Sequence, residues 1–395
     1  MAATVAGERS RLRLLQLTAL TSTADRFALA PLLVVIGRDL GVPLTAVAAV
    51  ASSYFLAYGV MQPVWGVVSD RIGRVAVMRL ALVGAALAGV GSAMAPNLVV
   101  LQVTRIVAGG CFAALQPTTL VYVGDVWPSA TRQRALSELL AASSFGIAVA
   151  TAGAGLVADL AGWRVVPAFT GLCGAALWVA LRRLPEPERD AARTGPLRAA
   201  AEVLRHRWAL VVFGLVLVEG AIVLGALTYL APAASHLGFS AGVAGLAAAA
   251  FGLGAVGWSR VVNALVGRVH PAGLAAIGGL LLVAGWAVVS LALTLATIVV
   301  AGLLVGGAWS FLHSTLQTWA TQVVPQQRAT AIALFAALLF LGSSAGTALA
   351  AGPAGAGAFP SIFATALAVA VPLAVLAAFA RARYGVRSSG PAASA

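Results

Sequence analysis

The chain has 395 residues, of which 61% are hydrophobic and 9% are charged, and its mean hydropathy is +0.98. An ordinary soluble domain has about 25% charged residues, so this composition excludes a water-soluble globule of this size and indicates a membrane protein. The formal net charge of +13 would suggest a nucleic-acid partner in a soluble protein, but here it comes from arginines whose distribution indicates orientation in a membrane instead.

Apolar runs of about 20 residues, each long enough to cross a bilayer as a helix, recur along the chain. Alternation with a period of two residues, which is typical of membrane barrels, is absent. The sequence therefore predicts an all-α polytopic membrane protein with twelve transmembrane helices. The predicted spans are residues 14–36, 46–65, 75–95, 98–122, 135–158, 164–184, 209–231, 240–262, 271–291, 296–322, 329–351 and 359–380.

Arginines concentrate in alternate loops, and the chain contains no lysine. With the N-terminus inside, 21 of the 25 arginines fall in inner loops, Arg38 and Arg164 fall outside, and Arg26 and Arg105 fall within spans. Positive charge favours the cytoplasmic side. The distribution therefore predicts a multi-pass protein of the plasma or inner membrane with both termini in the cytoplasm.

The first span contains Asp25 near its middle, with three hydroxyl side chains on the same helical face. A carboxylate at that depth cannot reach water and requires a polar interior. Two interpretations follow: Asp25 binds a proton or a cation, or it forms an ion pair with Arg26 or Arg105 that serves assembly alone. Ala30 and Pro31 are expected to end this helix.

The second span presents Tyr54, Tyr58 and Gln62 on one face, which predicts either a cavity lining or hydrogen bonds between helices. It is followed by Gly66-Val67-Val68-Ser69-Asp70-Arg71-Ile72-Gly73-Arg74. This stretch predicts a short charged turn at the membrane surface, in which glycine allows close helix approach or a tight turn. The pattern G-x-x-x-D-R-x-G-R resembles the signature loop of the major facilitator superfamily, a family of twelve-helix secondary transporters.

The fourth span contains Arg105, with Gln116 eleven residues later on nearly the same face. Arg-x-x-x-Gly at this place resembles a second superfamily motif, found especially in proton-coupled members. A structural tether to a carboxylate is the alternative for Arg105. The resemblance also implies that Asp125, at the end of this span, contacts Arg74 of the signature loop.

The fifth span departs from the pattern G-x-x-x-G-P-x-x-G-G that is common in the drug:proton antiporters of this superfamily. Gly162-Trp163-Arg164 resembles the loop that follows the span in the family and fixes the alignment. The proline is missing, and the equivalent positions are Gly146, Ala150, Thr151, Ala154 and Gly155.

Residues 185–207 form the only long polar stretch between spans. They are predicted to be a cytoplasmic linker, with a possible amphipathic piece around Leu197 to Arg207 that lies on the membrane surface. The linker divides the chain into a six-helix bundle over residues 1–184 and a second bundle and tail over residues 208–395.

The second half repeats features of the first, as expected of a duplicated transporter. Asp25 precedes Gly73 by 48 residues, and Glu219 precedes Gly267 by the same interval. The two deep acids therefore occupy corresponding places in the first and seventh spans. The second loop has Ala264 at the position of the acid, so a charged latch is expected on one half only.

The tenth span places His313 and Gln317 on one face, and His313 lies 197 residues after Gln116. His313 is a candidate proton carrier because imidazole titrates near neutral pH. A hydrogen bond to a neighbouring helix is the alternative.

Other chemistries have no support in the sequence. A chain without lysine cannot contain a Gly-x-x-x-x-Gly-Lys phosphate loop, and no cluster has metal-ligand spacing. Cys111 and Cys173 lie within apolar spans, where they are expected to be buried small hydrophobes. Neither an enzyme activity nor a cofactor is expected, and the expected partners are a small-molecule substrate, protons and the lipid bilayer, with the protein a monomer.

The superfamily resemblance implies alternating access, in which two bundles rock about a site near the bilayer midplane. Our hypothesis is proton-coupled efflux of a small amphipathic compound, most like the twelve-helix drug:proton antiporters. The alternatives are proton-coupled uptake of a metabolite and a non-transporting sensor on the same fold. The candidate residues are Asp25 and Glu219 for proton coupling, Tyr58, Arg105, Gln116, His313 and Gln317 for the substrate cavity, and Gly66, Asp70, Arg71, Gly73, Arg74 and Asp125 for a gating latch. The opposite charges of the deep residues leave cations, zwitterions and sugars open as substrates.

Overall fold

The computed structural model describes residues 2–187 and 195–388, and these residues are almost entirely helical. Eleven of the described helices are long and apolar enough to cross a membrane. The pair Glu8–Phe27 and Leu29–Leu40, bent by 45°, adds a twelfth span if it is counted as one. The predicted all-α polytopic fold is confirmed.

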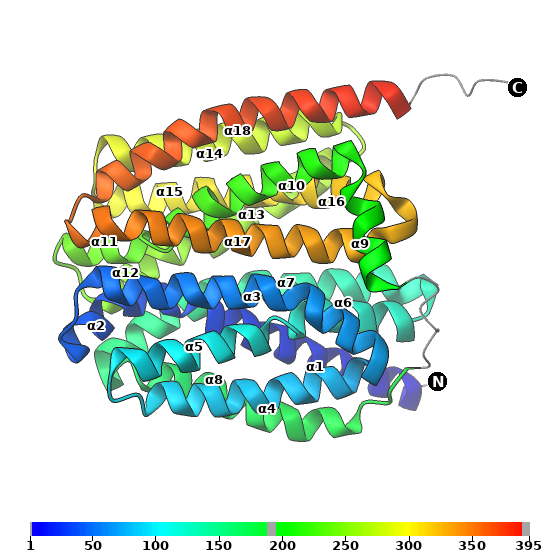
Figure 1. The fold of residues 1–395 in the computed structure, drawn as a ribbon, viewed down its shortest axis with the longest axis horizontal. Helices are drawn as coiled ribbons and strands as arrows, with labels where there is room; N and C mark the ends of the chain where they lie inside the picture. Colours follow the sequence, from blue (N-terminus) through cyan, green and yellow to red (C-terminus); the bar gives the residue numbers. More distant parts are fainter. Residues whose placement is uncertain (1, 188–194, 389–395) are drawn as a thin grey trace, which may run out of the picture.

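The helices of the first half pack together in the lower part of Figure 1, in blue to green. They are α1 (Ala2–Phe27), α2 (Leu29–Leu40), α3 (Leu44–Ile72), α4 (Arg74–Ala93), α5 (Leu98–Phe112), α6 (Leu115–Val126), α7 (Ser129–Ala161), α8 (Val165–Ala180) and the short 3-10 turn η1 (Leu181–Arg183). We call this group the first bundle.

The helices of the second half form the upper part of the same view, in green to red, and we call them the second bundle. The helix α9 (Pro196–Leu204) joins the two groups at one end. The second bundle contains α10 (Arg207–Gly220), η2 (Ala221–Gly225), α11 (Leu230–His236), α12 (Ala241–Ala248), α13 (Ala250–Leu265), α14 (Pro271–Leu291), α15 (Leu295–Ala308), η3 (Trp309–His313), α16 (Ser314–Val323), η4 (Pro325–Gln327), α17 (Arg328–Gly355) and α18 (Phe359–Ser388).

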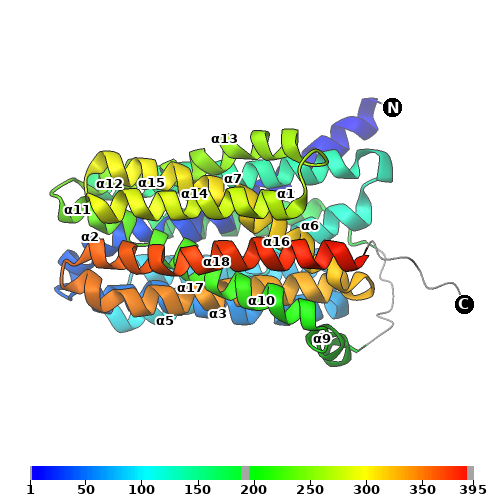
Figure 2. The same ribbon diagram turned by 90° about the horizontal axis from the view of Figure 1, so that it is seen from above.

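The two ends of the molecule differ in what they contain. The helix α1 begins, and α18 ends, at the end where α9 lies, as Figures 1 and 2 both show. We call this the linker end and the opposite one the far end. The turns between α2 and α3 and between α11 and α12 lie at the far end.

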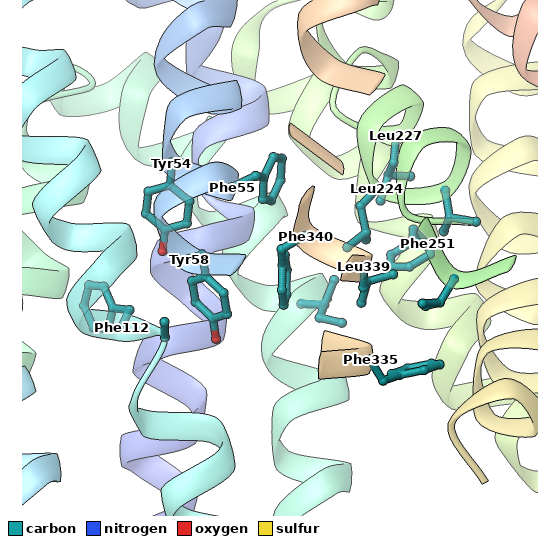
Figure 3. Close-up of a cluster of buried hydrophobic side chains, with 14 of the residues drawn as sticks. Tyr54, Phe55, Tyr58, Phe112, Leu224, Leu227, Phe251, Phe335, Leu339 and Phe340 are labelled. Atoms are coloured by element: carbon teal, nitrogen blue, oxygen red, sulfur yellow. The ribbon is translucent and has the colours of Figure 1, made fainter. Parts of the chain in front are cut away.

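The bundles meet through α3 with α17 and through α7 with α12 and α13. Glycines allow this close packing: Gly59 lies against the backbone of Ala337, and Gly155 lies against the backbone of Ala241, where a side chain would not fit. Small residues at helix contacts are the usual means of association in a bilayer, where burial of apolar surface gives little driving force. Figure 3 shows Phe340 of α17 between Tyr58 of the first bundle and Phe251 of the second.

Five of the described spans are interrupted away from their ends, one of them the eighth, at Ala249 between α12 and α13. Ala28 breaks the first span between α1 and α2, and residues 113–114 break the fourth between α5 and α6. The seventh and tenth spans each contain a π-helical turn, η2 and η3. Such turns occur frequently at functional sites because they free backbone groups and rotate the residues that follow.

Two local expectations from the sequence are wrong. Ala30 and Pro31 do not end the first helix, because Pro31 falls in the first turn of α2, where its missing N–H has no helical partner to lose. The charged stretch is not a turn throughout, since α3 continues to Ile72 and only Gly73, with φ of +107°, reverses the chain.

Candidate functional site

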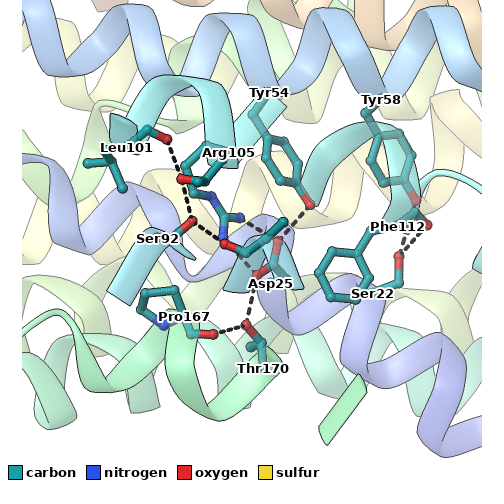
Figure 4. Close-up of polar contacts among 12 residues, drawn as sticks. Ser22, Asp25, Tyr54, Tyr58, Ser92, Leu101, Arg105, Phe112, Pro167 and Thr170 are labelled. Atoms are coloured by element: carbon teal, nitrogen blue, oxygen red, sulfur yellow. Dashed lines mark hydrogen bonds and ion pairs between the residues drawn. The ribbon is translucent and has the colours of Figure 1, made fainter. Parts of the chain in front are cut away.

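Asp25 and Arg105 form a buried ion pair inside the first bundle (Figure 4). Arg105 Nη1 donates to Asp25 Oδ1 at 3.0 Å, and Nη2 donates to Oδ2. The two side chains are 2% and 4% exposed for Asp25 and Arg105, respectively. The pair joins the end of α1, just before the break in the first span, to α5 of the fourth span.

Two hydroxyl groups complete the environment of the Asp25 carboxylate. Tyr54 Oη donates to Oδ2 at 3.0 Å, and Thr170 Oγ1 donates to Oδ1 at 2.8 Å, as Figure 4 also shows. Each carboxylate oxygen therefore accepts two hydrogen bonds. Tyr54 belongs to the polar stripe that the sequence shows on the second span, whereas no pattern in the sequence indicated Thr170.

Glu219 and His313 form the corresponding contact in the second bundle. Glu219 lies at the end of α10 and His313 ends the π-helical turn η3, and His313 Nδ1 lies 3.1 Å from Glu219 Oε2. The Glu219 side chain is fully buried, and its Oε1 has no hydrogen-bond partner among the described residues. With one shared proton the pair is neutral, either as carboxylate and imidazolium or as carboxylic acid and imidazole.

The two pairs have the same arrangement in the two halves. In each bundle an acid on the first span contacts a base on the fourth, next to an interruption of the helix. The sequence indicated corresponding places for Asp25 and Glu219 but did not pair Glu219 with His313. The acid and its partner are 80 residues apart in the first bundle and 94 residues apart in the second. Arg105 and His313 are therefore not at matching positions in the repeat.

A cavity between the bundles is lined by residues of both, and it contains about 530 Å³ of space free of protein atoms, open solvent included. Its lining is mostly aliphatic and aromatic, and Arg26 is its one charged residue. The polar lining residues besides Arg26 are Tyr54, Thr151 and Thr228. None of the five residues predicted for the substrate cavity lines this cavity, but Arg105 lines a second one together with Asp25.

Those five residues are used elsewhere. Tyr58 is fully buried and its Oη lies 3.4 Å from Ser22 Oγ, while Gln116 Oε1 accepts a hydrogen bond from Ser143 at 3.2 Å. Arg105 and His313 are held by the two acids. Gln317 lies in α16, four residues after His313, and is exposed.

The contact expected between Arg74 and Asp125 is present at the linker end. Arg74 Nε lies 3.3 Å from Asp125 Oδ2, and Nη1 lies 2.6 Å from Asp70 Oδ1. Arg74 thus connects the end of α3 to the end of α6, next to Arg71. The described ion pairs of these residues stay within the first bundle and do not reach the second.

Gly66, by contrast, is not a point of close helix approach. It is exposed, and a side chain at this position would meet no atom within 4 Å. Gly73 is required for a different reason than helix packing, since its backbone lies in the positive-φ region and a side chain there would meet the carboxylate of Glu186.

Glu186 is a contact that the sequence did not indicate. Its carboxylate accepts hydrogen bonds from the N–H groups of Arg74, Val75 and Ala76, which begin α4. These N–H groups have no partner within the helix, and the helix N-terminus attracts negative charge. The start of the predicted linker is therefore bound to the loop of Gly73.

Asp159 forms an equivalent cap between the bundles at the far end. It lies near the end of α7, and its Oδ1 and Oδ2 accept hydrogen bonds from the N–H groups of Ala241 at 3.1 Å and Gly242 at 2.7 Å, which begin α12. This acid of the first bundle therefore binds a helix of the second bundle at the far end. No feature of the sequence distinguishes Asp159 from an acidic residue in an exposed loop.

Metal chemistry receives no support from this arrangement. No group of three or more histidine, cysteine or acidic residues that could hold a metal ion occurs within residues 2–187 and 195–388. Cys111 and Cys173 are both free and partly buried.

The family model described as Major Facilitator Superfamily matches residues 15–347. The chain belongs to this superfamily. A chloramphenicol resistance protein of Streptomyces lividans is 28% identical over 385 residues, which are 93% of this chain and 95% of that protein. A triacylglyceride transporter of Mycolicibacterium hassiacum is 32% identical over 133 residues, 33% of this chain, and the match spans about a quarter of the transporter's length. A tetracycline resistance protein of Escherichia coli, class C, is 30% identical over 168 residues, 41% of this chain and 42% of that protein.

Solved superfamily structures have the same fold. A bacterial homologue of the human lysosomal transporter Spinster, solved in an inward-facing and unoccupied conformation, gives a TM-score of 0.77 with 17% identity, over 96% of this chain and 98% of that one. The nucleoside transporter NupG gives a TM-score of 0.78 with 14% identity, over 94% and 99%. This chain is a multi-pass membrane protein of the superfamily.

Proposed function

We propose that this transporter exports a small amphipathic compound in exchange for protons, by alternating access. The observation that carries the proposal is the pair of buried acid–base contacts, Asp25 with Arg105 and Glu219 with His313, one in each bundle. Buried acids in a membrane segment are costly to maintain and are characteristic of proton pathways. The two pairs lie near helix interruptions, so a change in their protonation can change how the spans pack.

Proton exchange changes the charge of each pair. When Asp25 takes up a proton, Arg105 is left as an uncompensated buried cation, which favours a conformation that exposes the pair to water. When the Glu219 and His313 pair takes up a second proton, it also becomes cationic. Burial and rehydration of the pairs are thus linked to proton uptake and release on the two sides of the membrane.

Export is supported by the relatives named for resistance to chloramphenicol and tetracycline. A membrane transporter protects a cell from such a compound by removing it. The mainly apolar lining of the central cavity, with a few polar groups, suits an amphipathic substrate.

We assign residues 1–184 and 208–395 to the two moving bundles, residues 185–207 to the linker, and the linker end to the cytoplasm of a plasma or inner membrane, with the protein acting as a monomer. The arginine distribution supports this orientation. Contacts through Gly155 and Asp159 join the two bundles at the far end.

The test uses the purified transporter in proteoliposomes with an imposed pH gradient and with chloramphenicol and tetracycline as the first compounds. We expect accumulation driven by the gradient, coupled to proton movement in the opposite direction, and its loss in Asp25→Asn and Glu219→Gln. Transport in the same direction as protons establishes uptake instead, and gradient-driven transport by both variants overturns the coupling assignment. Right-side-out and inverted vesicles from cells establish the direction in the membrane.

A further inference from the structure

Arg26 is a charged residue of the central cavity that has no counter-charge. Asp25, its neighbour in the chain, is bound by Arg105, Tyr54 and Thr170 on another face of the helix. Within residues 2–187 and 195–388, Arg26 has no ion pair or hydrogen bond, and its buried Nε lacks a partner. The sequence left open whether Asp25 pairs with Arg26 or Arg105, and the structure decides for Arg105.

Three aromatic rings surround the guanidinium group. Its Cζ lies 5.0 Å from the ring centre of Phe27, 5.1 Å from that of Tyr58 and 5.1 Å from that of Phe340. Phe27 and Tyr58 belong to the first bundle and Phe340 to the second. Ring faces attract a cation and keep it extended in an apolar environment, but they provide no hydrogen-bond acceptor for its N–H groups.

The electrostatic balance of the site therefore favours an anion. The charges of Asp25 and Arg105 compensate each other, and His313 is the partner of Glu219. Arg26 remains as the cation that lines the cavity, among aromatic and aliphatic groups such as Phe55, Leu224 and Phe251. A carboxylate or sulfonate would satisfy the unused N–H donors of Arg26 in a site whose lining is mainly apolar.

We propose that the central cavity binds an organic anion, an aromatic or branched apolar body with a carboxylate or sulfonate group, and that Arg26 binds the anionic group. The inference rests on the proposed function only in taking this cavity as the substrate site. It replaces the cations, zwitterions and sugars that the sequence left open as substrates with an anion.

The test measures binding to the purified full-length protein in detergent by the shift in its thermal midpoint and by titration. Three probes share a naphthyl body and differ in charge: 1-naphthylacetate, 1-naphthylacetamide and 2-(1-naphthyl)ethylammonium. We expect naphthylacetate to bind at least tenfold more tightly than the amide, and the ammonium compound to bind most weakly. Equal affinity for the acid and the amide, or no binding of naphthylacetate, overturns the inference.

Variants identify the residue. Arg26→Gln is expected to weaken naphthylacetate binding at least tenfold, the loss of a charge-assisted hydrogen bond, with little effect on the amide. Arg26→Lys is expected to retain most of the preference for the anion, and it still tests the proposal if Arg26→Gln does not fold. Arg38→Gln, at an exposed arginine at the end of α2, is the control and should leave all affinities unchanged.

This binding assay uses no membrane gradient, so it fails separately from the proposed function. Anion binding that depends on Arg26, without proton-driven transport in proteoliposomes, would remove the exchange mechanism and leave the inference standing. If the protein transports only neutral or cationic compounds with protons and shows no preference for naphthylacetate, the exchange mechanism stands and the anion inference is overturned.

Discussion

Arg105 donates hydrogen bonds from both terminal nitrogens to the two carboxylate oxygens of Asp25, although the residues lie 80 positions apart in the sequence. In this bidentate geometry the two charges compensate each other, and the two side chains link α5 to α1. Because a guanidinium stays protonated at any relevant pH, the charge of this pair depends on Asp25 alone.

We expect Asp25→Asn to lower the free energy of unfolding by about 3–5 kcal/mol, because it leaves Arg105 as an uncompensated buried charge. Denaturant titration of the detergent-solubilised protein measures this. The double variant Asp25→Asn with Arg105→Gln should regain part of the loss. Asp39→Asn is the matched control, since the Asp39–Arg164 pair is 41% exposed on both sides and such pairs contribute about 0–1 kcal/mol. Equal effects at the two sites would contradict the role of burial.

The contact between Glu219 and His313 leads to a prediction about coupling rather than stability. Glu219→Gln retains the shape of the side chain and removes its proton exchange. We expect gradient-driven accumulation to fall at least tenfold, whereas exchange of labelled for unlabelled substrate without a gradient continues. Glu138→Gln, at an exposed acid paired with Arg134, is the control and should transport normally. Unchanged accumulation by Glu219→Gln would exclude Glu219 from the coupling step.

Asp159 is predicted to stabilise closure of the far end. Asp159→Ala removes both acceptors for the N–H groups of Ala241 and Gly242, and we expect the far end to open about fivefold more often, equivalent to about 1 kcal/mol. The measurement is the labelling rate of a cysteine introduced at Thr151, which lines the cavity, by an impermeant reagent supplied at the far end.

That experiment uses a background in which the two native cysteines are replaced by alanine. Asp39→Ala is the matched control, because the partners of Asp39, Trp163 and Arg164, belong to the same bundle as Asp39 itself. A labelling rate that rises equally in both variants would indicate general loosening instead of a latch between bundles.

The two glycines of the charged stretch are predicted to differ in their tolerance of alanine. Gly73→Ala forces a side chain into positive φ and against the Glu186 carboxylate, so it should destabilise the protein by about 1–3 kcal/mol. Gly66→Ala adds a methyl group in open space within a helix and should be neutral or slightly stabilising for the conformation described here. Thermal denaturation of both variants checks this, and equal destabilisation would mean that Gly66 is packed in another conformation.

Much of the fold follows from composition and spacing. Twelve apolar runs, one polar linker and the pattern around Asp70 and Gly73 were sufficient to predict an all-α transporter of this superfamily. The match at Arg74 and Asp125 was also accessible, because the superfamily resemblance implies it. These features are local in the sequence or repeated along it, so they can be predicted from the order of residues alone.

The contents of the site were less accessible. Gln317 illustrates the reason, since it is exposed although regular helical spacing puts it on the same face as His313. Arg26 illustrates a second reason. It lacks a counter-charge because Asp25 pairs with Arg105, and the sequence does not show which of the two arginines Asp25 contacts. Thr170 and Glu186 contribute through contacts with residues far away in the chain, and no spacing rule reports such contacts.

The sequence by itself determined the all-helical membrane class, and it predicted the number of spans, the two halves and the depth of Asp25 and Glu219, because hydrophobicity, helix length and charge act along the chain. Only the tertiary structure decided the partners of those acids, the capping of α12 by Asp159 and the position of Arg26 among aromatic rings. The reason is that hydrogen bonds and ion pairs at about 3 Å depend on how helices pack in three dimensions.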